Sequence, residues 1–134
     1  MRPGNGPPPS RPAAIDLAAA ILVFGGLFGF SQLLVGDYVL TGSLPAKDPI
    51  RGVAFIAYGA AVVLGIVIRM GRAWLPALNF ALLFALLYLP AAGRPLVLAL
   101  VLGHAGAAVL LVRNRRWFSE MAAWRKPPTF RTGG

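Results

Sequence analysis

The sequence predicts an all-α fold: a four-helix transmembrane bundle with both termini in the cytoplasm, followed by a short amphipathic helix at the membrane interface. Hydrophobic residues make up 57% of the 134 residues and charged residues only 13%, whereas about a quarter of the residues of a soluble domain are charged. Four apolar stretches approach the ~20 residues that a helix needs to cross a bilayer. A chain of this composition could not bury its apolar surface in water, so we expect lipid to surround it.

The four predicted spans cover residues 16–35, 52–68, 73–90 and 95–112, within one transmembrane domain at residues 13–112. The first stretch is longer than the roughly 7–15 apolar residues of a signal peptide, so we expect it to be retained as a span. The turns between the second, third and fourth spans are short, which makes these spans antiparallel neighbours. The length of the chain leaves no room for a separate soluble domain.

Basic residues are distributed unevenly about the predicted spans. With the N-terminus inside, ten of them lie on the cytoplasmic side: Arg2, Arg11, Arg69, Arg72, Arg113, Arg115, Arg116, Arg125, Lys126 and Arg131. Only Lys47, Arg51 and Arg94 lie on the outer side. The cytoplasmic loops of membrane proteins carry such an excess of positive charge. We therefore predict a multi-pass protein of the plasma (cell) membrane with both termini in the cytoplasm.

The two ends of the chain are polar, and the segment after the fourth span is amphipathic. Residues 1–12 are rich in proline, and both this segment and residues 127–134 are predicted to be disordered tails. Residues 113–126 place Trp117 and Trp124 on one helical face between basic ends, which is typical of a helix lying among lipid headgroups. The alternative is that the fourth span continues into the cytoplasm and ends in a solvated basic segment.

The net charge of +9 would suggest a nucleic-acid partner in a soluble protein. Here the basic residues flank membrane spans, so the lipid bilayer with its anionic headgroups is the expected partner, and nucleic acid is not. The residues predicted to contact headgroups are Arg113, Arg115, Arg116, Trp117, Trp124, Arg125 and Lys126.

Small residues indicate where the helices pack together. Helices in a bilayer associate through close packing and polar contacts, so small residues line their interfaces. Gly25, Gly29 and Gln32 share one face of the first span, and Gly103 lies on a stripe of small residues in the fourth. These stripes fit a compact bundle and also fit a homo-oligomer. The pattern leaves open which faces meet within one chain and which meet between chains.

Two polar side chains within the spans are candidate functional residues. His104, the only histidine, falls near the midpoint of the fourth span. A proton relay, a haem site or a metal site would need further titratable or ligating groups, so we expect a neutral histidine hydrogen-bonded across the bundle. Asn79 shares a face of the third span with Leu82, Leu83 and Leu86. An amide facing lipid is costly, so Asn79 is expected to meet another helix, of this chain or of another protein.

Two motifs carry a resemblance to a known group of proteins. RMGRAW precedes the third span at residues 69–74, and RNRRWF follows the fourth at residues 113–118. In these motifs and in its layout the chain resembles small, uncharacterised four-span membrane proteins of actinobacteria. The resemblance implies the same four-span fold and no particular activity. Small multidrug transporters have a similar size and span number, but they depend on a glutamate in the first span, and this chain has none there.

Three functions remain open on the sequence alone. The first, which we favour, is a non-enzymatic accessory or structural subunit that associates with itself or with a larger membrane complex; it needs no catalytic residue, metal or cofactor. The second is a small oligomeric transporter or channel that uses His104 and Asn79. The third is a membrane redox or haem-binding subunit with His104 as the ligand. The absence of cysteine excludes disulfides, thiolate metal sites and cysteine nucleophiles.

Overall fold

The computed structural model describes residues 6–35 and 49–126, and these residues contain helices and no strands. The helices are α1 (Ala13–Val35), α2 (Pro49–Ile68), α3 (Trp74–Tyr88), the short 3-10 helix η1 (Leu89–Ala91), α4 (Pro95–Arg113) and α5 (Arg115–Arg125). The predicted all-α class is confirmed. Residues 36–48, which join the first two predicted spans, and the predicted tail at residues 127–134 lie outside the described residues.

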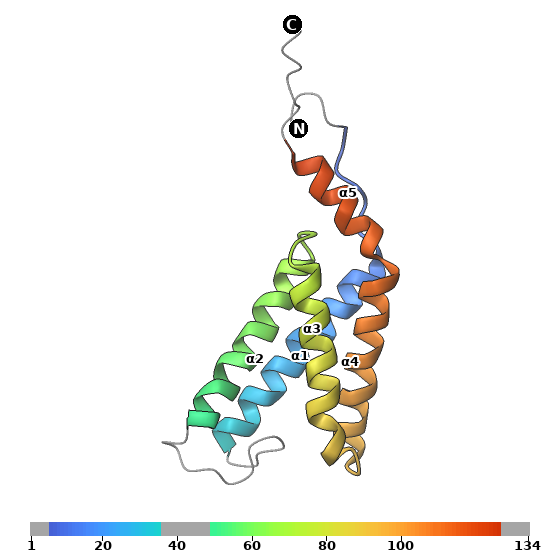
Figure 1. The fold of residues 1–134 in the computed structure, drawn as a ribbon. Coiled ribbons are helices and arrows are strands. Elements are labelled where there is room, and N and C mark those ends of the chain that lie inside the picture. The colour runs from blue at the N-terminus through green and yellow to red at the C-terminus, as the bar shows by residue number, and fades with distance from the viewer. Residues whose placement is uncertain (1–5, 36–48, 127–134) are drawn as a thin grey trace, which may run out of the picture.

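Helices α1 to α4 lie side by side, and α5 extends beyond them at one end (Figure 1). The most extensive contact is between α1 and α2; α4 packs on both α1 and α3, and the contact between α2 and α3 is smaller. The start of α1 and the turn from α2 to α3 lie at the same end as α5. We call this part of the molecule, formed by residues 6–16, residues 69–73 and α5, the α5 end.

Two of the described helices are long and apolar enough to cross a membrane, namely Ala13–Leu34 and Pro95–Arg113. The apolar helices Gly52–Ile68 and Trp74–Tyr88 are shorter. Two of the four predicted spans therefore reach spanning length by this measure.

The third predicted span, residues 73–90, is shorter as a helix than the sequence pattern indicates. Helix α3 has 15 residues, and Leu89 begins η1, with Pro90 in its first turn. Proline has no N–H to donate, and its ring clashes with the preceding helical turn. The apolar run continues past the end of α3, but the α-helix does not.

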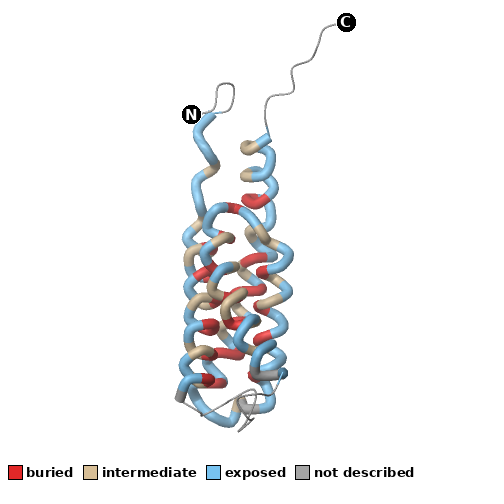
Figure 2. The backbone as a smooth tube through the Cα atoms, turned by 90° about the vertical axis from the view of Figure 1, so that its left-hand side faces the viewer, coloured by how far each residue is buried: buried red, intermediate tan, exposed pale blue. Residues whose placement is uncertain are grey.

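Buried positions are distributed along the packed helices (Figure 2), and their side chains form two apolar clusters. The cluster towards the α5 end includes Ile15, Leu22, Ile68, Leu111, Trp117 and Phe118. The other cluster includes Leu33, Tyr58, Phe84, Tyr88, Val97 and Leu100. Fully buried alanines separate the larger side chains: Ala18, Ala61, Ala77, Ala81 and Ala107. Such small side chains let helix backbones approach closely, which is how apolar helices gain packing energy.

Gly71 closes the turn between α2 and α3. Its φ of +70° lies in the left-handed region that favours glycine, and its N–H donates to the Ile68 carbonyl at 2.9 Å. A Cβ added to Gly71 would lie 2.8 Å from the Met121 side chain of α5. Glycine is therefore required both by the backbone of the turn and by the close approach of α5.

Asn114 separates α4 from α5. Its backbone leaves the helical region at φ −102° and ψ 15°, and its side-chain amide donates to the Leu110 carbonyl at 2.8 Å. Helix α5 then runs beyond the end of the other helices (Figure 1). The helix predicted at residues 113–126 is thus observed at Arg115–Arg125.

Residues 6–12 have no helix or strand and lie against α5. The Trp124 indole N–H donates to the Gly6 carbonyl at 2.8 Å, and the Trp117 indole N–H donates to the Pro9 carbonyl at 3.4 Å. Disorder is predicted for residues 1–12; in this structure two indole groups bind residues 6–12, and residues 1–5 lie outside the described residues.

Candidate functional site

His104 is fully buried near the middle of α4. Its Nδ1 lies 2.7 Å from the Leu100 carbonyl oxygen, one helical turn earlier. Because a carbonyl only accepts, Nδ1 carries the hydrogen and Nε2 of the neutral ring is left as an acceptor. No described group donates to Nε2. The hydrogen bond predicted across the helices is therefore made within α4 instead, since the carbonyl four residues earlier lies within reach of a helical side chain.

Gly25 of α1 covers the unpartnered edge of the His104 ring. A Cβ added to Gly25 would lie 2.5 Å from Nε2, far closer than atoms that are not bonded can approach. Gly29, one turn later, meets α2 instead, where an added Cβ would overlap the Tyr58 ring. The two glycines predicted as a packing seam thus contact two different helices of their own chain.

Two aromatic rings of α3 pack against His104, and a third ring, from α2, packs against one of them. Phe84 and Tyr88 of α3 have ring centroids 5.6 Å and 6.0 Å from that of His104, and Tyr58 of α2 lies 5.9 Å from Phe84. We call Tyr58, Phe84, Tyr88 and His104 the central cluster. The Tyr88 hydroxyl is close enough to Tyr58 for an electrostatic interaction, but it meets hydrogen-bond geometry with no described group.

The central cluster therefore holds two buried polar atoms that make no hydrogen bond to a described group, His104 Nε2 and the Tyr88 hydroxyl. Each such atom costs about 1–3 kcal/mol of stability relative to a satisfied one. The described residues contain no group of three or more His, Cys, Asp or Glu side chains that could hold a metal ion. Among the described residues, the central cluster contains one base, the His104 imidazole, and two phenols. No nucleophile is hydrogen-bonded to Nε2 of that imidazole.

Asn79 is exposed on α3, apart from the buried His104. Its neighbours Leu82, Leu83 and Leu86 are exposed too, and Ala77 on the opposite face is buried. The leucine face predicted for the third span is thus observed on α3, opposite a buried alanine. No described residue hydrogen-bonds the Asn79 amide, and the structure does not bring Asn79 and His104 together.

The other two predicted seam residues make weaker contacts. A Cβ added to Gly103 would lie 3.7 Å from the Ile21 side chain, an ordinary contact distance, so a methyl group fits at this position. Gln32 is partly exposed, and its amide makes no hydrogen bond to a described residue. Of the three glycines predicted to line a seam, Gly25 and Gly29 are the closely packed ones.

Three of the residues predicted to contact headgroups are engaged by the protein itself. Trp117 is only 6% exposed, and its indole donates to the Pro9 carbonyl. Trp124 donates to Gly6. The Arg125 guanidinium donates to the Met70 and Gly71 carbonyls, both at 2.6 Å. These side chains bind the N-terminal segment and the α2–α3 turn to α5.

The remaining candidates, Arg113, Arg115, Arg116 and Lys126, are exposed. Arg116 pairs with Glu120 one turn later at 2.9 Å. Desolvation lowers the pKa of the Arg125 guanidinium, and the positive charge of Arg72 lowers it further. An arginine stays charged at physiological pH even so, which means that like charges are gathered at the α5 end.

A three-residue ion-pair group at the α5 end was not anticipated from the sequence. The Arg69 Nε donates to Asp16 Oδ1 at 2.8 Å, and the Arg11 Nε lies 3.0 Å from the same oxygen. The sequence shows these charges at the ends of the predicted spans and on the same side of the membrane. It does not show that a single carboxylate oxygen joins two arginines from separate segments.

Comparison of the chain with protein-family models, with curated proteins and with solved structures found no match. Function must therefore be argued from the residues described above.

Proposed function

We propose that this chain is a four-span integral protein of the plasma membrane that serves as an accessory or structural subunit. The observation that carries the proposal is the apolar outer surface of all four packed helices. At least two large apolar side chains on each helix are about half exposed or more: Leu17, Phe24, Leu27 and Leu34 on α1; Val53, Phe55, Ile56, Val63 and Ile66 on α2; Leu75 and Leu86 on α3; Leu96, Leu102 and Val109 on α4.

Such a surface is stable in lipid and not in water. Burying one large apolar side chain is worth about 1.5–3 kcal/mol, and soluble monomers rarely expose large contiguous apolar patches. Here the exposed apolar residues surround the helices, while buried alanines and closely packed glycines lie among the contacts between helices. Lipid tails would cover the outside without competing for the small-residue seams.

The short α3 is compatible with a span. Its 15 residues rise about 22 Å at 1.5 Å per residue, against ~30 Å for the hydrocarbon core. Bilayers thin locally around short spans at modest cost, and flanking residues reach towards the interface. Trp74 stands at the first residue of α3, where aromatic residues of membrane helices are enriched.

The topology is testable with single-cysteine reporters, because the chain has no cysteine of its own. Gly93 and Arg72 are exposed in turns at opposite ends of the helices, and a Cβ at Gly93 would meet nothing within 4 Å. In intact cells an impermeant maleimide should label Gly93→Cys but label Arg72→Cys only after lysis. Labelling of both from the same side, or recovery of the protein in the supernatant without detergent, would contradict the four-span topology.

Asn79 supports the accessory role. Its exposed amide lies among exposed leucines. An unpaired amide in lipid is costly, and a hydrogen bond to a polar group on a neighbouring helix would remove that cost. We infer that this face of α3 associates with a second copy or with a larger membrane complex. In mild detergent, Asn79→Leu should lose the partner, which affinity purification and mass spectrometry would detect. Gln32→Leu, the same chemical change on α1, is the matched control.

The central cluster bears on the two other functions. A transporter needs a polar path, and the two residues proposed to line it lie in different environments, one buried and one exposed. A haem iron needs room at a histidine nitrogen, and Gly25 occupies the space at Nε2. Either function would require α1 to move away from α4. Loss of transport, or of a Soret band, in His104→Leu that still inserts would favour one of them over the accessory role.

A further inference from the structure

A groove of about 370 Å³ lies between α1 and α2 near the α5 end. Its walls are apolar and are formed by Ala19, Ala20, Val23, Gly65 and Ile66. The two helices touch at its floor, where a Cβ added to Gly65 would lie 2.8 Å from the Ala19 carbonyl oxygen. Because Ala19, Ala20 and Gly65 carry little or no side chain, the space above this contact is left empty.

The mouth of the groove is charged. Asp16 and Arg69 line it, and Arg11 joins them through Asp16 Oδ1, with its Nη1 donating to the Arg69 carbonyl at 3.3 Å. Both arginines use Nε on the same carboxylate oxygen. The three side chains therefore carry a net charge of +1, and the terminal amino groups of Arg69 donate to no described residue. Paired N–H donors of this kind match the oxygens of a phosphate group.

The surroundings of the mouth add to its positive potential. Arg72 follows Arg69 in the α2–α3 turn, and Arg125 binds that turn through the Met70 and Gly71 carbonyls. Apart from Asp16, the acidic residue among the described residues of the α5 end is Glu120, which pairs with Arg116. A cluster of arginines next to apolar walls is complementary to an anionic headgroup joined to an acyl chain.

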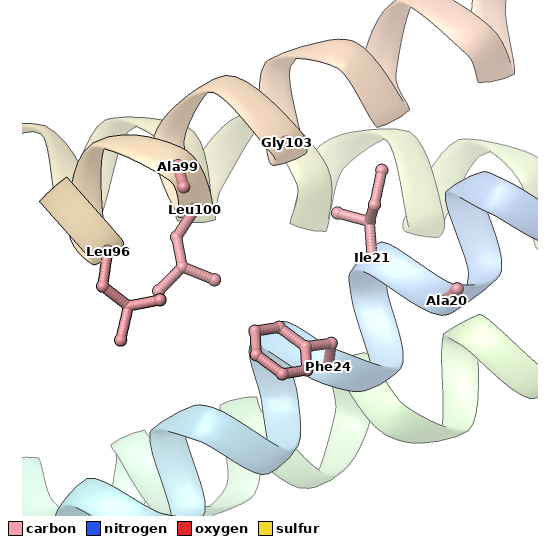
Figure 3. A pocket seen from close by; sticks show the side chains of 7 residues that line it. All are labelled: Ala20, Ile21, Phe24, Leu96, Ala99, Leu100 and Gly103. Atoms are coloured by element: carbon pink, nitrogen blue, oxygen red, sulfur yellow. The ribbon is translucent and has the colours of Figure 1, made fainter.

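A second groove provides a contrast. It lies between α1 and α4, has a volume of about 290 Å³, and is lined by Ala20, Ile21, Phe24, Leu96, Ala99, Leu100 and Gly103 (Figure 3). None of these side chains carries a charge. Such a groove can accommodate lipid tails but has nothing to recognise a headgroup, so it serves as an internal control for the first groove.

We propose that the groove between α1 and α2 binds one anionic phospholipid, with an acyl chain along Ala20, Val23 and Ile66 and the phosphate at Arg69 and Arg11. This inference rests on the proposed membrane insertion and adds a specific ligand class and place to it. The site differs from the predicted headgroup contacts on residues 113–126, because its arginines come from α1's leading segment and from the end of α2.

The test uses the full-length protein in detergent, with dioleoyl phosphatidylglycerol or dioleoyl phosphatidylcholine added and bound lipid counted by native mass spectrometry. The wild type should retain one phosphatidylglycerol in preference to phosphatidylcholine. Arg69→Gln should lower that retention about fivefold, the equivalent of the ~1 kcal/mol that one arginine contributes near an anionic surface. Arg94→Gln makes the same charge change at the opposite end of the helices and should leave retention unchanged.

Two further variants test the groove itself. Ala20→Leu places a larger side chain at the border of both grooves, and Ala99→Leu narrows only the groove between α1 and α4. Ala20→Leu should displace the lipid, and Ala99→Leu should not. Equal losses in Arg69→Gln and Arg94→Gln, equal binding of the two lipids, or displacement by inorganic phosphate alone would overturn the proposal. Failure of membrane insertion would appear separately, as protein that does not float with vesicles.

Discussion

The central cluster and the α5 end are stabilised by different kinds of interaction. In the central cluster, close packing dominates: Gly25 and Gly29 leave room for the rings of His104 and Tyr58, while two buried polar atoms make no hydrogen bond to a described group. At the α5 end, polar contacts dominate: two indoles and one guanidinium donate hydrogen bonds to backbone carbonyls. The difference indicates that close packing stabilises the apolar middle and that hydrogen bonds stabilise the end expected to meet water and headgroups.

The largest effect should come from filling the space at Gly25. Gly25→Ala should lower the free energy of unfolding by about 1–3 kcal/mol, because the added methyl group overlaps the fully buried His104 ring and forces α1 or α4 to shift. Unfolding in mixed detergent micelles, followed by circular dichroism, would measure the loss. This loss should come from the steric overlap with His104 and not from helix propensity, because helix propensity favours alanine over glycine by about 1 kcal/mol.

The matched variants for this test are Gly106→Ala and His104→Ala. A Cβ at Gly106 would meet nothing within 4 Å, so Gly106→Ala should leave stability unchanged or raise it slightly. Combining Gly25→Ala with His104→Ala should cost at least ~1 kcal/mol less than the sum of the single changes. If the two changes simply add, Gly25 and His104 are not in contact in the native protein.

The α5 end should lose stability when its hydrogen bonds are removed. Arg125→Gln should cost about 1–2 kcal/mol, because it removes a charged donor from two carbonyls of the α2–α3 turn. Limited trypsin digestion would report the change, since cleavage after Arg69 and Arg72 should accelerate once α5 no longer covers the turn. Arg115→Gln makes the same substitution at an exposed position of α5. Faster cleavage in Arg115→Gln to the same degree would show that net charge, not the bond to the turn, protects these sites.

The sequence predicted the two regions unequally. Helix positions followed from apolar runs, because run length and breakers are local properties; the end of α3 was misplaced because Pro90 stops the α-helix before the apolar run ends. The leucine face of α3 was also readable, since it depends only on helical periodicity. That periodicity placed Asn79 correctly on the exposed leucine face.

Contacts between segments that are distant in the chain could not be predicted from the sequence in this way. The glycine face of α1 was visible, but its partners depend on how α1 crosses α2 and α4. The position of Trp117 in the sequence is typical of an aromatic ring at the lipid boundary. In the structure its side chain is buried instead, near Gly71, and its indole donates to the Pro9 carbonyl. The Asp16–Arg69 pair joins residues 53 positions apart. No local pattern specifies such a pair.

A smaller effect of opposite sign is expected in the central cluster. Tyr88→Phe should raise the free energy of unfolding by about 1 kcal/mol, because it removes a buried hydroxyl that has no described partner and leaves the ring in place. Tyr58→Phe, the same change on α2, should not raise it, since the Tyr58 hydroxyl is not an unpartnered buried group. Thermal unfolding in one detergent would compare the two. A loss of stability in Tyr88→Phe would mean that its hydroxyl is bonded in the native state, which would weaken the contrast with the α5 end.

The smallest expected effect measures the surroundings of α5. Arg116 and Glu120 form an i,i+4 pair at 2.9 Å, and the Arg116 side chain is 90% exposed. In water such a pair contributes only about 0.3–0.5 kcal/mol, so Arg116→Ala and Glu120→Ala, combined in a double-mutant cycle, should show a coupling near that value. The coupling should fall when salt is raised, since exposed charges are screened. A coupling several-fold larger that resists salt would place α5 in the low-dielectric interface and not in water, because the attraction between two charges increases as the dielectric constant falls.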